Sequence, residues 1–363
     1  MAWINLALAM FSGINFPTLS TVSILILGIR RFKYFKIKFN IFSFLVVIFF
    51  TIFLFLKYNY NELNLNNIKL FFSLYSQIIA CIVIANSYVK YPNTFFKILF
   101  FYFIGLIIYL NYLSYLFISV IATEDVNRVI LLSSESSLNG TSFGALCLLS
   151  SFSYYLFVCL DYKNIFLKIF LISSLVLYII INFMLLNRLA TTVLPIVLLI
   201  ALYKKYGFYN LFVLVLIFSI SVKDKFISLI TESMFFERVT EMGFKTARWD
   251  SFSYFNELLT ASFFGGNFVK SRYQISFLHN LFLDIFDSSG FIPFILFVLI
   301  FIIFYSKLFK NRNIINKFPL EFIYVFTFII FLMAFFEPVF DISVHYANFI
   351  VLVFIFYNNH FKK

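Results

Sequence analysis

Long apolar stretches separated by short polar segments run along almost the whole chain. Their approximate bounds are 4–29, 39–56, 70–89, 98–121, 143–160, 165–186, 189–203, 208–222, 286–306, 319–340 and 344–357. Most of them approach or exceed the roughly 18 to 20 residues that a helix needs to cross the hydrocarbon core of a bilayer. The pattern therefore predicts an all-α fold, a polytopic transmembrane helix bundle of about 11 to 12 spans.

The first apolar stretch is irregular, because Gly13 and Pro17 interrupt it. Taken as one helix, it gives eleven spans and places the two ends of the chain on opposite sides of the membrane. Taken as two helices, it gives twelve spans. No internal repeat or Pro/Ser-rich linker divides the sequence, so we expect a single integral membrane domain over 1–363.

One polar segment, 223–280, is far longer than the other loops, which include the Asn-rich 57–69 and the Ser-rich 122–142. Long loops inside a compact domain are usually functional. Apolar residues recur in the long loop at steps of three and four, at Trp249, Phe252, Phe255, Leu259 and Phe263. This spacing predicts a helix of roughly 246–263 that lies on the membrane surface and is ended by Gly265-Gly266.

The composition agrees with a membrane protein and excludes an ordinary soluble domain. The chain is 63% hydrophobic and 12% charged, whereas a soluble domain carries about 25% charged residues. Mean hydropathy is +0.97.

Charge predicts the orientation of the bundle. One set of alternate loops, which includes 30–38 and 307–317 and the tail 358–363, holds well over half of the 28 Lys and Arg residues but only two acids. The positive-inside rule therefore places these loops and the C-terminus in the cytoplasm, and 223–280 on the opposite face. Topology and contact with anionic lipid explain the basic pI, so nucleic-acid binding is not required.

Three features on the outer face carry candidate chemistry. The first is Arg188, between two apolar spans with almost no loop. A charge at that depth indicates a functional residue, and the alternative is a snorkelling arginine that reaches the headgroups.

The second feature is a charged cluster in the long loop that includes Arg238 and Arg248. An arginine guanidinium is a planar fork of donors that suits phosphate oxygens. The alternative is a solvated helix face with local ion pairs, for instance between Glu241 and Lys245.

The third feature is His279-Asn280, where the long loop returns to the membrane, followed by Asp284. The pKa of an unperturbed histidine, about 6.5, suits it to accept a proton from a hydroxyl. Asn280 and Asp284 share a helical face. The alternative is a helix-capping or interfacial histidine. The sequence contains no convincing metal site and none of the common nucleotide-binding or hydrolase motifs.

The stretch from Gly265-Gly266-Asn267 through His279-Asn280 to Gly290 resembles the bacterial O-antigen polymerase and ligase superfamily. Proteins of that superfamily show a glycine turn, a His-Asn pair that opens a helix, and a glycine about ten residues later. Asn187-Arg188 at an outer turn is similar to the conserved arginine of the family, and Arg238 and Arg248-Trp249 are similar to its loop arginines. One departure is the N-terminus, which the eleven-span count places outside.

The resemblance favours an O-antigen repeat-unit polymerase of the bacterial inner membrane, with its active site facing the periplasm. Such an enzyme is an inverting, metal-independent glycosyltransferase that needs no cofactor and uses an undecaprenyl-pyrophosphate-linked oligosaccharide. It implies that His279 is the base, that Arg248 and Arg188 stabilise the pyrophosphate, and that Arg238, Asn280 and Asp284 bind substrate. Membrane lipid and a chain-length regulator protein are candidate partners.

Three alternatives stay open. An O-antigen ligase, which transfers polymer to lipid A–core, shares the same motif. A lipid-linked oligosaccharide flippase should carry paired interrupted helices and midplane charges in both halves, which the asymmetric outer loops do not suggest. A structural or receptor role leaves the His-Asn pair unexplained.

Overall fold

The computed structural model describes residues 2–14, 16–34, 41–59, 65–121, 129–133, 136–185, 187, 189–207, 253–274, 278, 280–311, 321–336 and 344–360. Seven of the described helices are long and apolar enough to cross a membrane. The predicted all-α transmembrane bundle is confirmed. The expected span 208–222 and the loop residues 223–252 lie outside the described part of the chain.

The chain divides into two compact units, which are treated separately. Unit 1 comprises Met1–Leu99 and Ala247–Lys363, and unit 2 comprises Phe100–Thr246. The helices of unit 1 are α1 (Ala2–Gly13), α2 (Pro17–Phe32), α3 (Ile41–Asn59), α4 (Leu65–Ser87), α11 (Phe255–Ala261), α12 (Phe268–Tyr273), α13 (Leu281–Ser289), α14 (Phe291–Lys310), α16 (Glu321–Phe336) and α18 (Val344–His360). Helix α5 (Pro92–Ile121) begins in unit 1 and continues into unit 2.

The first apolar stretch forms two helices, so the prediction of a single first span is wrong. Helix α1 ends at Gly13 and α2 begins at Pro17, whose fixed φ suits the first turn of a helix. At 1.5 Å per residue, α1 is about 18 Å long, which is shorter than the roughly 30 Å hydrocarbon core. The two helices pack against each other.

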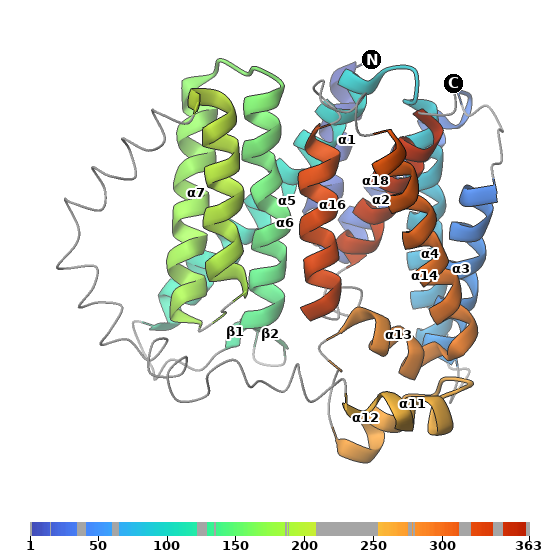
Figure 1. The fold of residues 1–363 in the computed structure, drawn as a ribbon. Coiled ribbons are helices and arrows are strands. Elements are labelled where there is room, and N and C mark those ends of the chain that lie inside the picture. The colour runs from blue at the N-terminus through green and yellow to red at the C-terminus, as the bar shows by residue number, and fades with distance from the viewer. Residues whose placement is uncertain are drawn as a thin grey trace. The chain divides into compact units, whose positions relative to one another are not determined.

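Unit 1 has one end rich in basic groups, which we call the basic end. Here Asn5 of α1 donates to the hydroxyl of Tyr88, and the guanidinium of Arg30 donates to Asn5 Oδ1. His360, the last residue of α18, is hydrogen-bonded to the Val89 carbonyl oxygen. Helix α1 therefore begins at the same end of unit 1 at which α18 finishes (Figure 1). The eleven-span expectation of chain ends on opposite sides is wrong for this reason.

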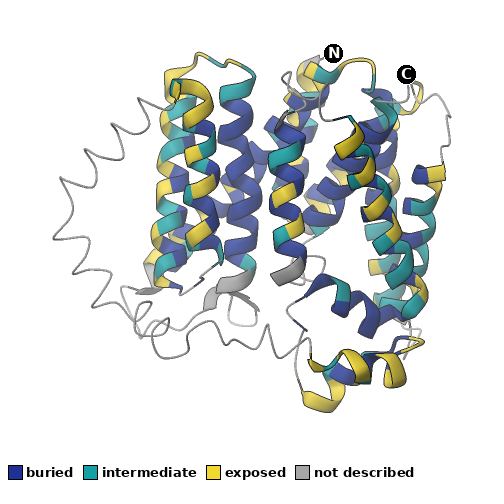
Figure 2. Cartoon of the chain, in the orientation of Figure 1, coloured by how far each residue is buried: buried dark blue, intermediate teal, exposed yellow. Residues whose placement is uncertain are grey.

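Helix α18 lies in the interior of unit 1, and every residue from His345 to Asn358 is buried. Its packing uses stacked phenylalanines: the ring centroids of Phe304 and Phe354 are 3.8 Å apart. Asn348 donates to Gln77 Oε1 at 3.0 Å, which ties α18 to α4. Figure 2 shows that exposed residues recur instead along the outer faces of α3 and α14, where apolar side chains suit contact with lipid.

Unit 2 contains the rest of α5, α6 (Gly140–Cys159), α7 (Ile165–Met184) and the helix Leu189–Gly207. Tyr178 of α7 donates to Asn111 Oδ1 of α5 at 2.9 Å. The segment 122–142, expected to be a loop, contains an antiparallel hairpin of β1 (Val129–Ser133) and β2 (Ser136–Asn139). Strand β2 runs directly into α6. The expected single membrane domain stays a prediction.

The arrangement of α1 and α18 makes a topology prediction. A fluorescent protein that folds only in the cytoplasm should fluoresce when fused to either end of the chain, because both ends of unit 1 converge on the basic end. An alkaline phosphatase inserted at 60–64, between α3 and α4, should be active. A dark N-terminal fusion combined with a bright C-terminal fusion would contradict this topology.

Candidate functional site

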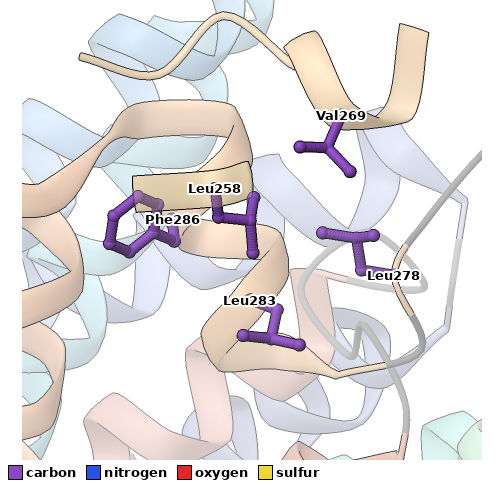
Figure 3. Packing of buried hydrophobic residues seen from close by; sticks show 5 residues of the cluster. All are labelled: Leu258, Val269, Leu278, Leu283 and Phe286. Carbon is purple, nitrogen blue, oxygen red and sulfur yellow. The ribbon is translucent and has the colours of Figure 1, made fainter. Parts of the chain in front are cut away.

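Three short helices, α11, α12 and α13, form a cap at the end of unit 1 opposite the basic end (Figure 1). Its small core consists of Leu258, Val269, Leu278, Leu283 and Phe286, which point toward one another (Figure 3). Helix α11 ends at Ala261, two residues before the predicted end, and Trp249 and Phe252 lie outside the described residues. Phe255, Leu259 and Phe263 of the predicted stripe are exposed.

The two glycines that bound the motif lie against each other's backbone. A Cβ on Gly265 would lie 2.8 Å from the Ser289 carbonyl carbon, and one on Gly290 would lie 2.7 Å from Phe263 O. Both glycines have positive φ, at 88° and 87°. The Phe291 amide donates to Phe263 O at 2.9 Å. The spacing of these glycines therefore reflects a close backbone crossing, which a side chain at either position would block.

A buried carboxylate joins α12 to α13. Asp287 Oδ1 accepts hydrogen bonds from Ser262 Oγ and from the Val269 amide, the latter at 3.0 Å. Its Oδ2 accepts from the Lys270 amide at 3.1 Å. These amides belong to the first turn of α12, where a negative charge is favourable. Asp287 thus caps α12, and its contacts account for its burial without a catalytic role.

Asn280 begins α13. Its side-chain oxygen accepts from the Phe282 and Leu283 amides at 2.9 and 3.1 Å, which is the hydrogen-bonding pattern of an N-cap residue. Asn280 is buried. The sequence predicted a helix opening at the His-Asn pair, and the structure shows that the asparagine is the residue that starts the helix.

Asp284 lies one turn into α13 and is 3% exposed. Its Oδ1 accepts from the Leu278 amide at 2.9 Å and lies 3.3 Å from Lys270 Nζ. Its Oδ2 is buried and has no hydrogen-bond partner among the described residues. A buried polar atom of this kind needs an explanation, because leaving it unbonded costs free energy.

A second lysine lies near the same carboxylate. Lys57, in the last turn of α3, interacts electrostatically with Lys270 and with Asp284. Helix α13 contacts α3 directly. Three elements that are far apart in the sequence therefore bring two ammonium groups and one carboxylate together at the cap.

The exposed side of the cap carries a separate charged pair. Arg272 Nη1 lies 2.6 Å from Glu257 Oε1, and the Tyr273 hydroxyl donates to Glu257 Oε2 at 2.8 Å. The hydrogen bond to this carboxylate raises the pKa of Tyr273. The Arg272 side chain is 70% exposed, and ion pairs at such positions contribute about 0–1 kcal/mol. The pair links α11 to α12.

In unit 2, the turn before Arg188 is also fixed by asparagines. Asn187 Oδ1 accepts from the Ala190 amide at 3.1 Å and so caps the helix Leu189–Gly207. The Asn187 amide donates to Asn182 O at 2.9 Å. A Cβ on Gly144 of α6 would lie 2.0 Å from Asn187 Nδ2, so only glycine allows α6 this close to the turn.

Of the six predicted site residues, the structure places Asn280 and Asp284 together at the cap. Arg188, Arg238, Arg248 and His279 lie outside the described residues. Their assigned roles stay predictions. Asn187, Leu278 and Asn280, the described neighbours of Arg188 and His279 in the sequence, are held by hydrogen bonds.

Sequence reasoning missed Lys57 and Lys270. Both belong to the outer set of charged residues, but arginines were favoured because their planar fork matches phosphate oxygens. Lys57 follows directly on an apolar span, and Lys270 lies four residues after Gly266. In the sequence, Lys57 is marked only by its place at the end of an apolar span, and Lys270 only by its place beside the glycine motif. The packing of α3 on α13 is what brings the two lysines close together.

Comparison with known proteins finds no matching family model, no matching curated protein and no matching solved structure.

The glycine crossing predicts a stability difference between two alanine variants. Gly290→Ala should lower the melting temperature of the detergent-solubilised protein by several degrees more than Gly207→Ala. Both glycines have positive φ, at which a non-glycine residue costs about 1–3 kcal/mol. A Cβ on Gly290 also meets backbone at 2.7 Å, whereas one on Gly207 meets nothing within 4 Å. Equal shifts in the two variants would show that the crossing is not tight.

Proposed function

We propose that this chain is a polysaccharide polymerase of the bacterial inner membrane. It transfers a growing undecaprenyl-pyrophosphate-linked glycan onto the next lipid-linked repeat unit at the periplasmic face. The cap is the site of this reaction, at the end of unit 1 away from the basic, cytoplasmic loops.

The observation that carries the proposal is the Asp284 carboxylate in the helix that Asn280 begins. It is buried, and one of its oxygens has no hydrogen-bond partner among the described residues. Lys270 lies 3.3 Å from its other oxygen, and Lys57 interacts with it electrostatically. An ion pair with a purely structural role does not explain why Asp284 Oδ2 is buried without a hydrogen-bond partner among the described residues. A site that binds a polar, anionic substrate at the membrane surface accounts for the two cations and the carboxylate together.

The reaction is a single displacement at the anomeric carbon. A hydroxyl oxygen of the acceptor sugar forms the new bond, and the bond from the anomeric carbon to the pyrophosphate oxygen breaks. The pyrophosphate leaves with the electron pair, and His279 takes the hydroxyl proton. Because the attack comes from the face opposite the leaving group, the configuration inverts. The resemblance assigns to Arg188 and Arg248, with Arg238 in support, the task of offsetting the charge that develops on the leaving group.

Asp284 and Asn280 have different roles in this proposal. The Asn280 side-chain oxygen accepts two backbone amides of α13, so Asn280 positions the start of that helix. Asp284 is better suited than Asn280 to orient the acceptor hydroxyl or the imidazole. Its Oδ1 accepts the Leu278 amide, and its Oδ2 has no hydrogen-bond partner among the described residues. Asp284 is therefore the orienting residue in this proposal.

A deletion strain distinguishes the candidate functions. We expect its lipopolysaccharide gel to show lipid A–core that carries a single repeat unit, because repeat units are made and ligated but not joined. Bare core with long polymer held on undecaprenyl would indicate a ligase. Bare core with single repeats trapped on the cytoplasmic face would indicate a flippase and would overturn the proposed mechanism.

Point variants test the assigned chemistry. His279→Ala and Arg248→Ala should leave the protein in the membrane and lower polymer formation by about 100-fold or more, since a general base typically contributes that much. His360→Ala, at the basic end, and Arg272→Ala, in the exposed ion pair, are the matched controls and should give normal polymer. Normal chain lengths from His279→Ala would show that His279 is not the base.

A further inference from the structure

The displacement described above assigns no role to Lys57 and Lys270, the two lysines near Asp284. Lys270 Nζ lies 3.3 Å from Asp284 Oδ1, and the Lys270 and Asp284 side chains are 11% and 4% exposed. Lys57 interacts electrostatically with both residues from the last turn of α3. The position of each lysine is set by helix packing, because α13 contacts both α3 and α12.

Two ammonium groups that approach each other in a site of low polarity repel, and a shared anion offsets that repulsion. In the described structure the shared anion is a single carboxylate, whose Oδ1 also accepts the Leu278 amide. A pyrophosphate offers several charged oxygens on two phosphorus atoms, so it can bind both ammonium groups at once. Lysine commonly binds phosphate as a point charge.

The location of the pair also suits a leaving group. Asp284 is bonded to the amide of Leu278, the residue directly before His279. A phosphate held by Lys57 and Lys270 would therefore lie close to the segment that supplies the proposed base. In a displacement at a sugar carbon, the base and the residues that hold the leaving pyrophosphate must lie within about one sugar ring of each other.

We propose that Lys57 and Lys270 bind the pyrophosphate of the polyprenyl-linked donor, and that Asp284 is their counterion when no substrate is bound. The inference rests on the proposed function and names the residues that recognise its substrate. Binding of the donor releases Asp284 from the lysines, so that its carboxylate can accept a hydrogen bond from the acceptor hydroxyl or the imidazole.

The test is a binding measurement on the full-length protein in lipid nanodiscs. The probes are undecaprenyl pyrophosphate, undecaprenol and inorganic pyrophosphate. Lys57→Gln and Lys270→Gln should each weaken undecaprenyl pyrophosphate binding about tenfold or more, as expected for the loss of a hydrogen bond between charged groups. Both variants should bind undecaprenol normally. Lys69→Gln changes an exposed lysine of α4 and should bind both lipids normally.

Two further variants separate binding from a structural role. Lys57→Arg and Lys270→Arg keep the charge and should retain most of the affinity for undecaprenyl pyrophosphate. Asp284→Asn should strengthen that binding several-fold, because the lysines lose the anion that competes for them. If the glutamine variants do not fold, Asp284→Asn still tests whether the two lysines bind the pyrophosphate. Unchanged or weaker binding in Asp284→Asn would overturn the proposal.

The remaining outcomes distinguish a failure of the proposed lysine site from a failure of the proposed function. Inorganic pyrophosphate that binds as tightly as the lipid would overturn the assignment to a lipid-linked donor. A polymerase phenotype of the deletion strain, with full affinity in both glutamine variants, would overturn the lysine site and leave the proposed function standing. Loss of affinity in those variants together with a flippase phenotype would support the lysine site and overturn the function.

Discussion

The cap depends on the buried carboxylate of Asp287. It accepts the first amides of α12 and the Ser262 hydroxyl, and a buried carboxylate is tolerated only where such donors surround it. By fixing α12 on α13, it also fixes Lys270 near Asp284. The glycine crossing at Gly265 and Gly290 then holds the turn after α11 against the end of α13. These two constraints hold Lys270 and Asp284 in place within the cap.

Hydropathy was sufficient to predict the fold class, because a membrane leaves few alternatives to apolar helices that satisfy their own backbone hydrogen bonds. It did not resolve the first stretch, where Gly13 and Pro17 divide α1 from α2, because window hydropathy is insensitive to a two- or three-residue break. It also missed the hairpin within 122–142. Polar residues there gave no alternating pattern strong enough to predict a strand.

The candidate site was predictable only where its residues are close in sequence. The spacing from Gly265 to Gly290 points to the segment that contributes to the cap, and Asn280 and Asp284 lie together in the structure because they share one short helix. Lys57 contributes through the packing of α3 on α13. No local pattern encodes that contact, so the sequence pointed to arginines of the long loop instead.

The two predicted motifs belong to different units, but each contains an asparagine that caps a helix. Arg188 follows Asn187, and His279 precedes Asn280. Each asparagine caps a helix with its side-chain oxygen, and each motif depends on glycine for a close approach, at Gly144 in one unit and at the glycine crossing in the other. A capping asparagine fixes the backbone at a helix start within one residue of the candidate group. Helix capping thus accounts for the hydrogen bonds of both asparagine side-chain oxygens, without a role in the chemistry.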